Sequence, residues 1–96
     1  MDVLKLKKPV MIDGVEKTEI EYDLNRLTGE DVHLATKELQ QMQIAVLTIE
    51  LDTNYHAALF ARAAGIMFAD VKRFSLRDYT KATTLVRDFF LSDLEE

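Results

Sequence analysis

The first third of the chain most constrains its fold. Apolar residues occupy every second position on both sides of a turn signal: Leu4, Leu6, Val10, Ile12, Ile20 and Tyr22. This period of two is typical of strands with one buried face. The dipeptide between the two runs, Asp13-Gly14, favours a tight hairpin turn. The sequence therefore predicts a β-hairpin over residues 3–22.

Two registers are compatible with this turn. A two-residue loop at Asp13-Gly14 pairs Leu6 with Glu21, which sets an apolar side chain beside a charged one. A three-residue loop that ends at a left-handed Gly14 pairs Leu6 with Ile20 instead. We predict the second register, because it gathers the apolar side chains on one face.

Proline 9 and the open edges add two expectations. Pro9 has no backbone N–H, so the first strand should have an unpaired stretch or lie at a sheet edge. A two-stranded ribbon is marginal in water, so its apolar face must pack on helices or join another sheet. Its edges are either solvated or accept a strand from a partner or from a second copy of the chain.

Helix start and stop signals fill the rest of the chain. Thr28 followed by Asp31 matches a capping box and predicts a helix from about residue 29 to about residue 41. Either Asp52 or Thr53 caps a second helix over 55–64, and Gly65 stops it.

The last third contains two further helical segments. A short helix or single turn is expected over 69–74, and Ser75 with Asp78 caps a final helix to about residue 91. Segment 43–51 is rich in β-branched residues and is left open between helix, break and short strand. The acidic tail 92–96 should fray, because it places negative charge at the negative end of a helix.

These segments predict a single α+β domain over residues 1–96. It consists of an N-terminal β-hairpin packed on a small bundle of three to four helices, with the helical part over 28–91.

Composition and charge exclude several classes of function. The formal net charge of −5 leaves no general basic field to attract phosphates, which argues against a nucleic-acid partner. The absence of cysteine excludes disulfides, thiolate nucleophiles and Cys-ligated metals. No apolar run approaches the ~20 residues that span a bilayer, and the N-terminal residues carry no secretory signal. We therefore expect a cytoplasmic protein with no membrane partner.

No group of residues in the sequence indicates catalysis. His33 and His56 lie far apart without metal-ligand spacing and are interpreted as structural or surface histidines. The glycines are isolated, so no phosphate-binding loop is predicted, and Ser75 is already assigned as a helix cap. We predict no catalytic residue, no metal and no cofactor, and hence no enzyme.

Apolar side chains are the remaining candidates for function. Five phenylalanines and four methionines are a generous supply for 96 residues. They either form the core or line a groove for an amphipathic helix, where methionine tolerates varied partners. The candidate partner-contact residues are Met42, Phe60, Phe89 and Phe90.

Six short segments in this order resemble the tail assembly chaperones of long-tailed bacteriophages and prophages. They are Leu6–Val10, Ile12–Gly14, Leu27–Asp31, Tyr55–Leu59, Ser75–Tyr79 and Val86–Leu91. The resemblance covers almost the whole chain and supplies no motif residues for a binding site. It implies a non-catalytic protein that binds the tape measure protein, keeps it soluble and helps tail tube protein polymerise around it. The chain acts either alone or as a homo-oligomer.

Two other interpretations stay open. The first is a small prophage or host regulatory adaptor that dimerises through its helices. A basic recognition helix would support it, but Arg77, Lys81 and Arg87 are interleaved with acidic residues. The second is a tail structural subunit, which would form stable rings and is disfavoured by the short predicted sheet.

Overall fold

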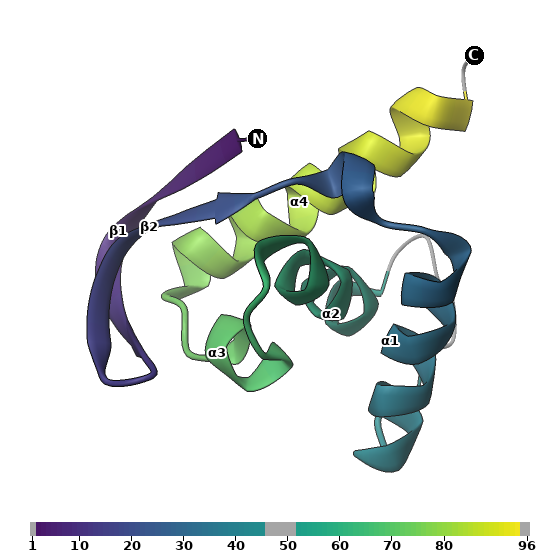
Figure 1. Cartoon of the computed structure of the whole chain (residues 1–96), viewed down its shortest axis with the longest axis horizontal. Helices are drawn as coiled ribbons and strands as arrows, with labels where there is room; N and C mark the ends of the chain where they lie inside the picture. The colour runs from purple at the N-terminus through teal and green to yellow at the C-terminus, as the bar shows by residue number, and fades with distance from the viewer. Residues whose placement is uncertain (1, 46–51, 95–96) are drawn as a thin grey trace.

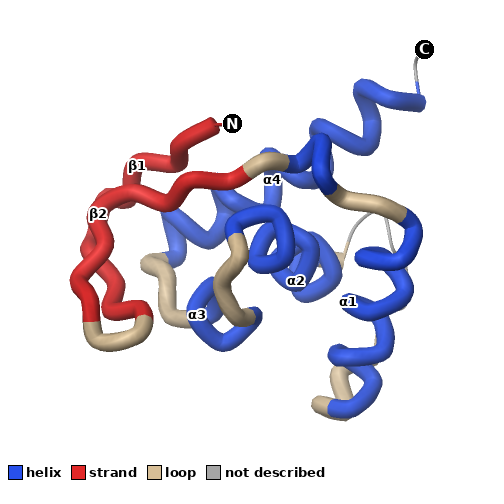
Figure 2. The backbone as a smooth tube through the Cα atoms, viewed as in Figure 1, coloured by secondary structure: helices blue, strands red, loops and turns tan. Residues whose placement is uncertain are grey.

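The computed structural model describes residues 2–45 and 52–94, in which a bent hairpin lies against a group of helices (Figure 1). In chain order the elements are β1 (Asp2–Ile12), β2 (Val15–Tyr22), the short 3-10 helix η1 (Leu24–Arg26), α1 (Gly29–Gln41), α2 (Thr53–Ala64), α3 (Phe68–Lys72) and α4 (Leu76–Leu94). Figure 2 shows that both strands precede all the helices. The predicted α+β class, a hairpin packed on about four helices, is confirmed.

The turn of the hairpin differs from the prediction. Asp13 and Gly14 form a two-residue loop with φ values of 53° and 78°, and Ile12 pairs with Val15. Positive φ at both central residues is typical of a type I′ turn, whose twist matches that of the flanking strands. The predicted three-residue loop is therefore wrong, and the strand partner of Ile20 is Leu4.

An irregularity in β1 restores the apolar face. Regular pairing stops at Lys5 and resumes at Val10, and residues 6–9 face only Thr18 of β2. The predicted unpaired stretch around Pro9 is confirmed. At this point four residues of β1 lie opposite one residue of β2. Because the difference of three is odd, the buried β1 side chains lie opposite even-numbered residues of β2 before the irregularity and opposite odd-numbered residues after it. Apolar residues on both sides of the irregularity therefore reach the core.

Local signals set the helix boundaries close to the predicted ones, although α2 begins at Thr53 instead of Tyr55. Thr28 and Asp31 form the capping box of α1, in which the Asp31 carboxylate accepts the Thr28 backbone N–H at 2.8 Å. Of the two candidate caps for α2, the structure uses Asp52, whose carboxylate accepts a backbone N–H of the first turn at 3.0 Å. Gly65 ends α2 with a φ of 70°. The short helix expected over 69–74 is α3.

The C-terminal end of α1 is a chain reversal. Gln43 has a φ of 62°, its N–H donates to the Gln40 carbonyl at 3.0 Å, and the Ile44 N–H donates to the Leu39 carbonyl at 2.9 Å. This pair of bonds is the Schellman motif. The predicted end near Gln41 is confirmed, whereas the open part of the segment at 46–51 lies outside the described residues.

The far end of the chain is only partly described. Helix α4 continues to Leu94, past the predicted end near residue 91, and residues 95–96 lie outside the described part. Fraying of the acidic tail 92–96 therefore stays a prediction.

Helix α2 lies at the centre of the core. It contacts α1, α3, α4, η1 and β2, and every residue from Tyr55 to Ala61 is buried. A helix that is buried on all sides needs apolar residues all round, and its alanines let neighbouring elements approach closely. Phe60 is 0% exposed, with its ring 5.2 Å from that of Tyr22 and 6.3 Å from that of Phe74. The core therefore surrounds α2 and includes residues of the hairpin and of the other helices.

Candidate interaction surface

A buried carboxylate joins the hairpin to α4. Asp78, which is 1% exposed, accepts the backbone N–H of Lys7 at 2.9 Å and that of Lys8 at 3.2 Å. The Ser75 hydroxyl donates to the same carboxylate at 2.9 Å and accepts the Asp78 N–H at 3.2 Å, which completes the predicted cap of α4. Lys7 and Lys8 lie in the irregular stretch of β1, where pairing with β2 is interrupted. The Asp78 carboxylate therefore accepts their N–H groups in place of β2.

The charge of Asp78 is stabilised by these donors. Burial by itself raises the pKa of the carboxyl group, because it disfavours the charged form. The N–H groups of Lys7 and Lys8 and the Ser75 hydroxyl outweigh burial and hold the pKa below its ordinary value. Asp78 is therefore a structural anion at neutral pH, and its lone pairs are already engaged.

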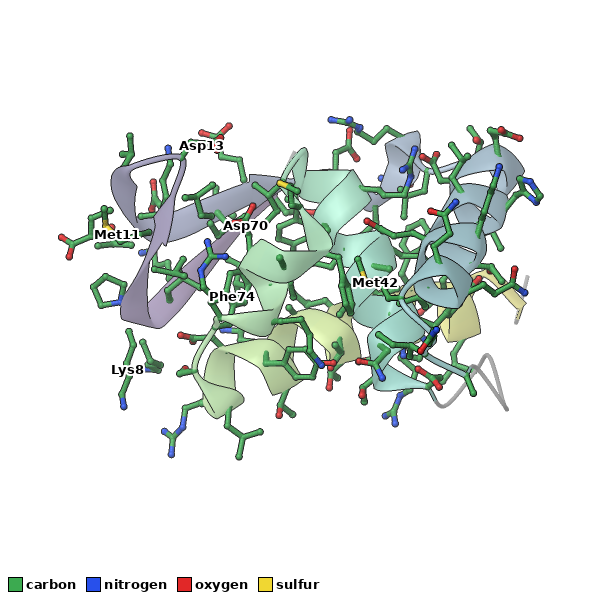
Figure 3. The ribbon with its side chains drawn as sticks, turned by 90° about the horizontal axis from the view of Figure 1, so that it is seen from below. Lys8, Met11, Asp13, Met42, Asp70 and Phe74 are labelled. Atoms are coloured by element: carbon green, nitrogen blue, oxygen red, sulfur yellow. The ribbon has the colours of Figure 1, made fainter. Side chains whose placement is uncertain are left out.

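A second polar contact fastens the tip of the hairpin to α3. The Arg73 guanidinium donates to the Met11 carbonyl oxygen at 2.6 Å and to the Asp70 carboxylate at 2.6 Å. Figure 3 shows Asp70 and Phe74 on the helical side, and Lys8 and Met11 on the outer side of the hairpin. The hairpin is therefore held at its middle by α4 and at its tip by Arg73.

The two histidines do not form a site. His33 is exposed on α1, whereas His56 is 3% exposed within α2. Burial lowers the pKa of His56, and the charge of Arg87 lowers it further, so this imidazole is neutral near pH 7. Over residues 2–45 and 52–94, no three His, Asp or Glu side chains are grouped so that they could hold a metal ion.

Phe89 and Phe90, two of the predicted contact residues, lie together near the end of α4. Their ring centroids are 6.2 Å apart in an edge-to-face arrangement. Both side chains are half-buried, and the adjacent Leu91 is 45% exposed. After Val86, no described side chain of α4 is buried, and Figure 1 shows this end of the helix extending beyond the other helices. We call Phe89, Phe90 and Leu91 the α4 apolar end.

The other two predicted contact residues lie elsewhere. Met42, which is 46% exposed, caps the C-terminal end of α1, and Figure 1 places that end on the opposite side of the molecule from the end of α4. Phe60 has no exposed surface. The structure thus brings together only two of the four residues. Phe60 therefore offers no surface to a partner in this conformation.

Comparison with known proteins shows the family of the chain. The model of the family described as "Phage tail assembly chaperone proteins, E, or 41 or 14" matches residues 3–91. The chain belongs to this family. The match confirms the resemblance inferred from the sequence. No curated protein and no solved structure matches the chain.

The range matched to the tail assembly chaperones takes in almost every feature described above. It begins in β1 and ends within α4 at Leu91, so it includes the Asp78 junction and the whole α4 apolar end. No helix in the described part of this tail assembly chaperone is long and apolar enough to cross a membrane.

The predicted contact residues leave out several exposed apolar side chains of the chaperone. They are Val3, Met11, Val15, Met67 and Leu76. Val3 and Met11 could have been found, because they occupy the odd positions of β1 that alternate with its buried residues. Leu76 is 81% exposed beside an open depression of about 690 Å³ that Lys7, Lys8 and Arg77 also line. The exposure of Leu76 could not have been recognised in the sequence, because its helical spacing to the half-buried Tyr79 is that of a core position.

Proposed function

We propose that this chaperone binds the tape measure protein of its phage tail, keeps it soluble and assists polymerisation of tail tube protein around it. It acts in the host cytoplasm by binding alone, without catalysing a reaction. The observation that carries this proposal is the family match over residues 3–91.

The geometry supports an apolar contact at the α4 apolar end. A tape measure chain is long and presents apolar helical stripes, which need cover before assembly. A protruding helix end with Phe89, Phe90 and Leu91 only partly covered offers such a stripe a matching surface. Because the patch is small and its rings also contact the bundle, the contact is modest and can be released when tube protein arrives.

The proposal is tested by co-expression with the tape measure protein. The chaperone should keep the tape measure protein in the soluble fraction and copurify with it. Leu91→Gln should reduce this recovery severalfold, because it places a polar group in the apolar contact without a change in charge. Leu76→Gln is the matched control, since it alters an exposed leucine at the other end of the same helix and should leave recovery unchanged.

Two results would count against the proposal. Tape measure protein that stays insoluble with the wild-type chaperone present, with no complex recovered, contradicts the binding function itself. Equal losses in the two leucine variants contradict the assignment of the α4 apolar end while leaving the function standing.

Reversibility is tested by adding tail tube protein to the purified complex. We expect tube protein to polymerise on the tape measure protein and the chaperone to appear free in the supernatant after the tubes are pelleted. A chaperone that stays in the pellet in stoichiometric amount contradicts a temporary role.

A further inference from the structure

Strand β2 has an open edge. It pairs with β1 alone, and no backbone hydrogen bond joins residues 15–21 to another segment within the described residues. The side chains from Val15 to Glu19 are all exposed. A groove of about 450 Å³ follows the strand and is lined on its other side by Ala64 and Ile66. The described residues therefore leave the position of a third strand empty.

The turn determines which backbone groups point to this edge. In a type I′ turn the Ile12 carbonyl accepts the Val15 N–H, so these two residues form a hydrogen-bonded pair. Hydrogen-bonded and non-bonded pairs alternate along an antiparallel ladder. Lys17 therefore faces β1, whereas Glu16 and Thr18 direct their N–H and carbonyl groups to the open edge.

We propose that the open edge of β2 pairs antiparallel with β2 of a second copy of the chain, with Thr18 opposite the partner's Thr18. Because the Thr18 N–H and carbonyl groups both point to the open edge, the two Thr18 residues form a hydrogen-bonded pair at the centre of the contact. Each Thr18 N–H donates to the carbonyl oxygen of the other Thr18. The four strands then form one sheet in the order β1, β2, β2 of the second copy, β1 of the second copy.

The charges next to Thr18 favour a second copy as the occupant. In this register Lys17 stands opposite the partner's Glu19, and Glu19 stands opposite the partner's Lys17. A two-fold contact requires a self-complementary surface, and the run Lys17-Thr18-Glu19 has that property. Both charged pairs fall at non-bonded positions of the ladder, where facing side chains lie closest.

The contact is small. Stable interfaces bury about 1,200–2,000 Å² in total, and pairing of a single short strand covers less than that. The dimer should therefore dissociate on dilution. The edge of β2 is separate from the α4 apolar end, so this proposal and the proposed function can fail independently.

Sedimentation velocity over a wide range of protein concentration tests the proposal. Self-association should weaken about tenfold with Lys17→Glu, which turns two attractive pairs into two repulsive ones. The double variant Lys17→Glu/Glu19→Lys restores opposite charges and should recover association. Glu21→Lys is the matched control, because it reverses an exposed charge on the same strand and faces the uncharged Val15 of the partner subunit.

Two further measurements separate edge pairing from loss of fold. Thr18→Pro removes the outward N–H opposite the irregularity, so it should abolish self-association while circular dichroism and the melting temperature stay near those of the wild type. Amide exchange at high concentration should slow at Glu16 and Thr18 and stay unchanged at Lys17.

The proposal is overturned by a chain that is monomeric at every concentration, or by a folded double variant that does not regain association. It is also overturned if Thr18→Pro abolishes binding of the tape measure protein while the wild type sediments as a monomer, since the edge would then serve that partner.

Discussion

At the scale of single residues, one side chain does most to connect the two halves of the molecule. The Asp78 N–H donates to the Ser75 hydroxyl that caps α4, and the Asp78 carboxylate accepts the N–H groups of two residues from the other end of the chain. A capping box is visible in sequence because its residues are three apart. The use of the same carboxylate by Lys7 and Lys8, which are 71 and 70 positions away, is not visible there.

Replacement of Asp78 should be costly. Asp78→Ala leaves two backbone N–H groups and the Ser75 hydroxyl without their carboxylate acceptor, so the free energy of unfolding should fall by about 3 kcal/mol. Asp78→Asn keeps one acceptor oxygen and should cost less. Urea denaturation measures both, with the exposed Asp88→Asn on the same helix as control. A loss for Asp78→Ala no larger than that for Asp88→Asn contradicts the role of the junction.

His56 should make stability depend on pH. Its folded pKa lies below the ordinary value of 6.5, so between these two pKa values the unfolded chain binds a proton at His56 and the folded chain does not. The free energy of unfolding is therefore fully retained above about pH 6.5 and falls as the pH drops below it, with a slope of at most about 1.4 kcal/mol per pH unit.

Denaturation curves between pH 7.5 and 5 check this expectation. His56→Gln, which cannot take up a proton, should flatten the dependence in that window. The carboxyl groups of Asp31 and Asp78 also have lowered pKa values, but their contribution is lost only as the pH falls below about 4. A wild-type curve that is flat from pH 7.5 to 5 is incompatible with a neutral buried His56.

At the scale of elements, the helix ends are set by hydrogen bonds and backbone conformations within a few residues of each end. The end of α1 shows this most clearly, because the left-handed residue of its Schellman motif is Gln43 rather than the usual glycine. A side chain with a Cβ atom is strained in that conformation. The motif forms nonetheless, because the bonds to the Leu39 and Gln40 carbonyls satisfy groups that the helix end would otherwise leave free.

Glycine at this position should therefore stabilise the protein. Gln43→Gly should raise the free energy of unfolding by about 0.5–1 kcal/mol, since relief of the Cβ strain exceeds the entropy cost of glycine. Gln41→Gly, two residues earlier at the last position of α1, should lower it by up to about 1 kcal/mol. Thermal denaturation gives both signs, and a loss of stability in Gln43→Gly would mean that α1 does not end in this motif.

At the scale of the whole molecule, the core and the surface divide the phenylalanines between them. Phe60 lies between the rings of Tyr22 and Phe74, whereas Phe89 and Phe90 lie where α4 leaves the bundle. All three have the same apolar character in the sequence. Only the packing of the hairpin and α4 around α2 decides which ring has exposed surface.

This division predicts different effects of substitution. Phe60→Ala should lower the free energy of unfolding by about 3–5 kcal/mol, and the better-filling Phe60→Leu should cost less and leave tape measure binding unchanged. The double variant Phe89→Ala/Phe90→Ala should lose much of the binding, because it removes both rings of the α4 apolar end. Denaturation and copurification measured on the same preparations check both halves. A folded Phe60→Leu chain that loses binding would return Phe60 to the contact surface.

Much of the architecture followed from residues a few positions apart. The hairpin, the caps at Thr28, Asp52 and Ser75, and the helix end at Gly65 are local features, because each depends on hydrogen bonds or φ values within about four residues. The order of such segments along the chain also sufficed to indicate the tail assembly chaperone family.

The tertiary structure alone decided the register of the hairpin and the surface of the molecule. The two-residue turn was rejected from sequence because it breaks the apolar face, and it is allowed because Asp78 stabilises an irregularity that restores that face. The burial of Phe60 and the exposure of Leu76 follow equally from which elements pack together. The Asp78 carboxylate affects the hairpin register, and the Phe60 ring becomes buried, through contacts with residues far away in the chain. Such contacts exist only after folding has brought these residues together.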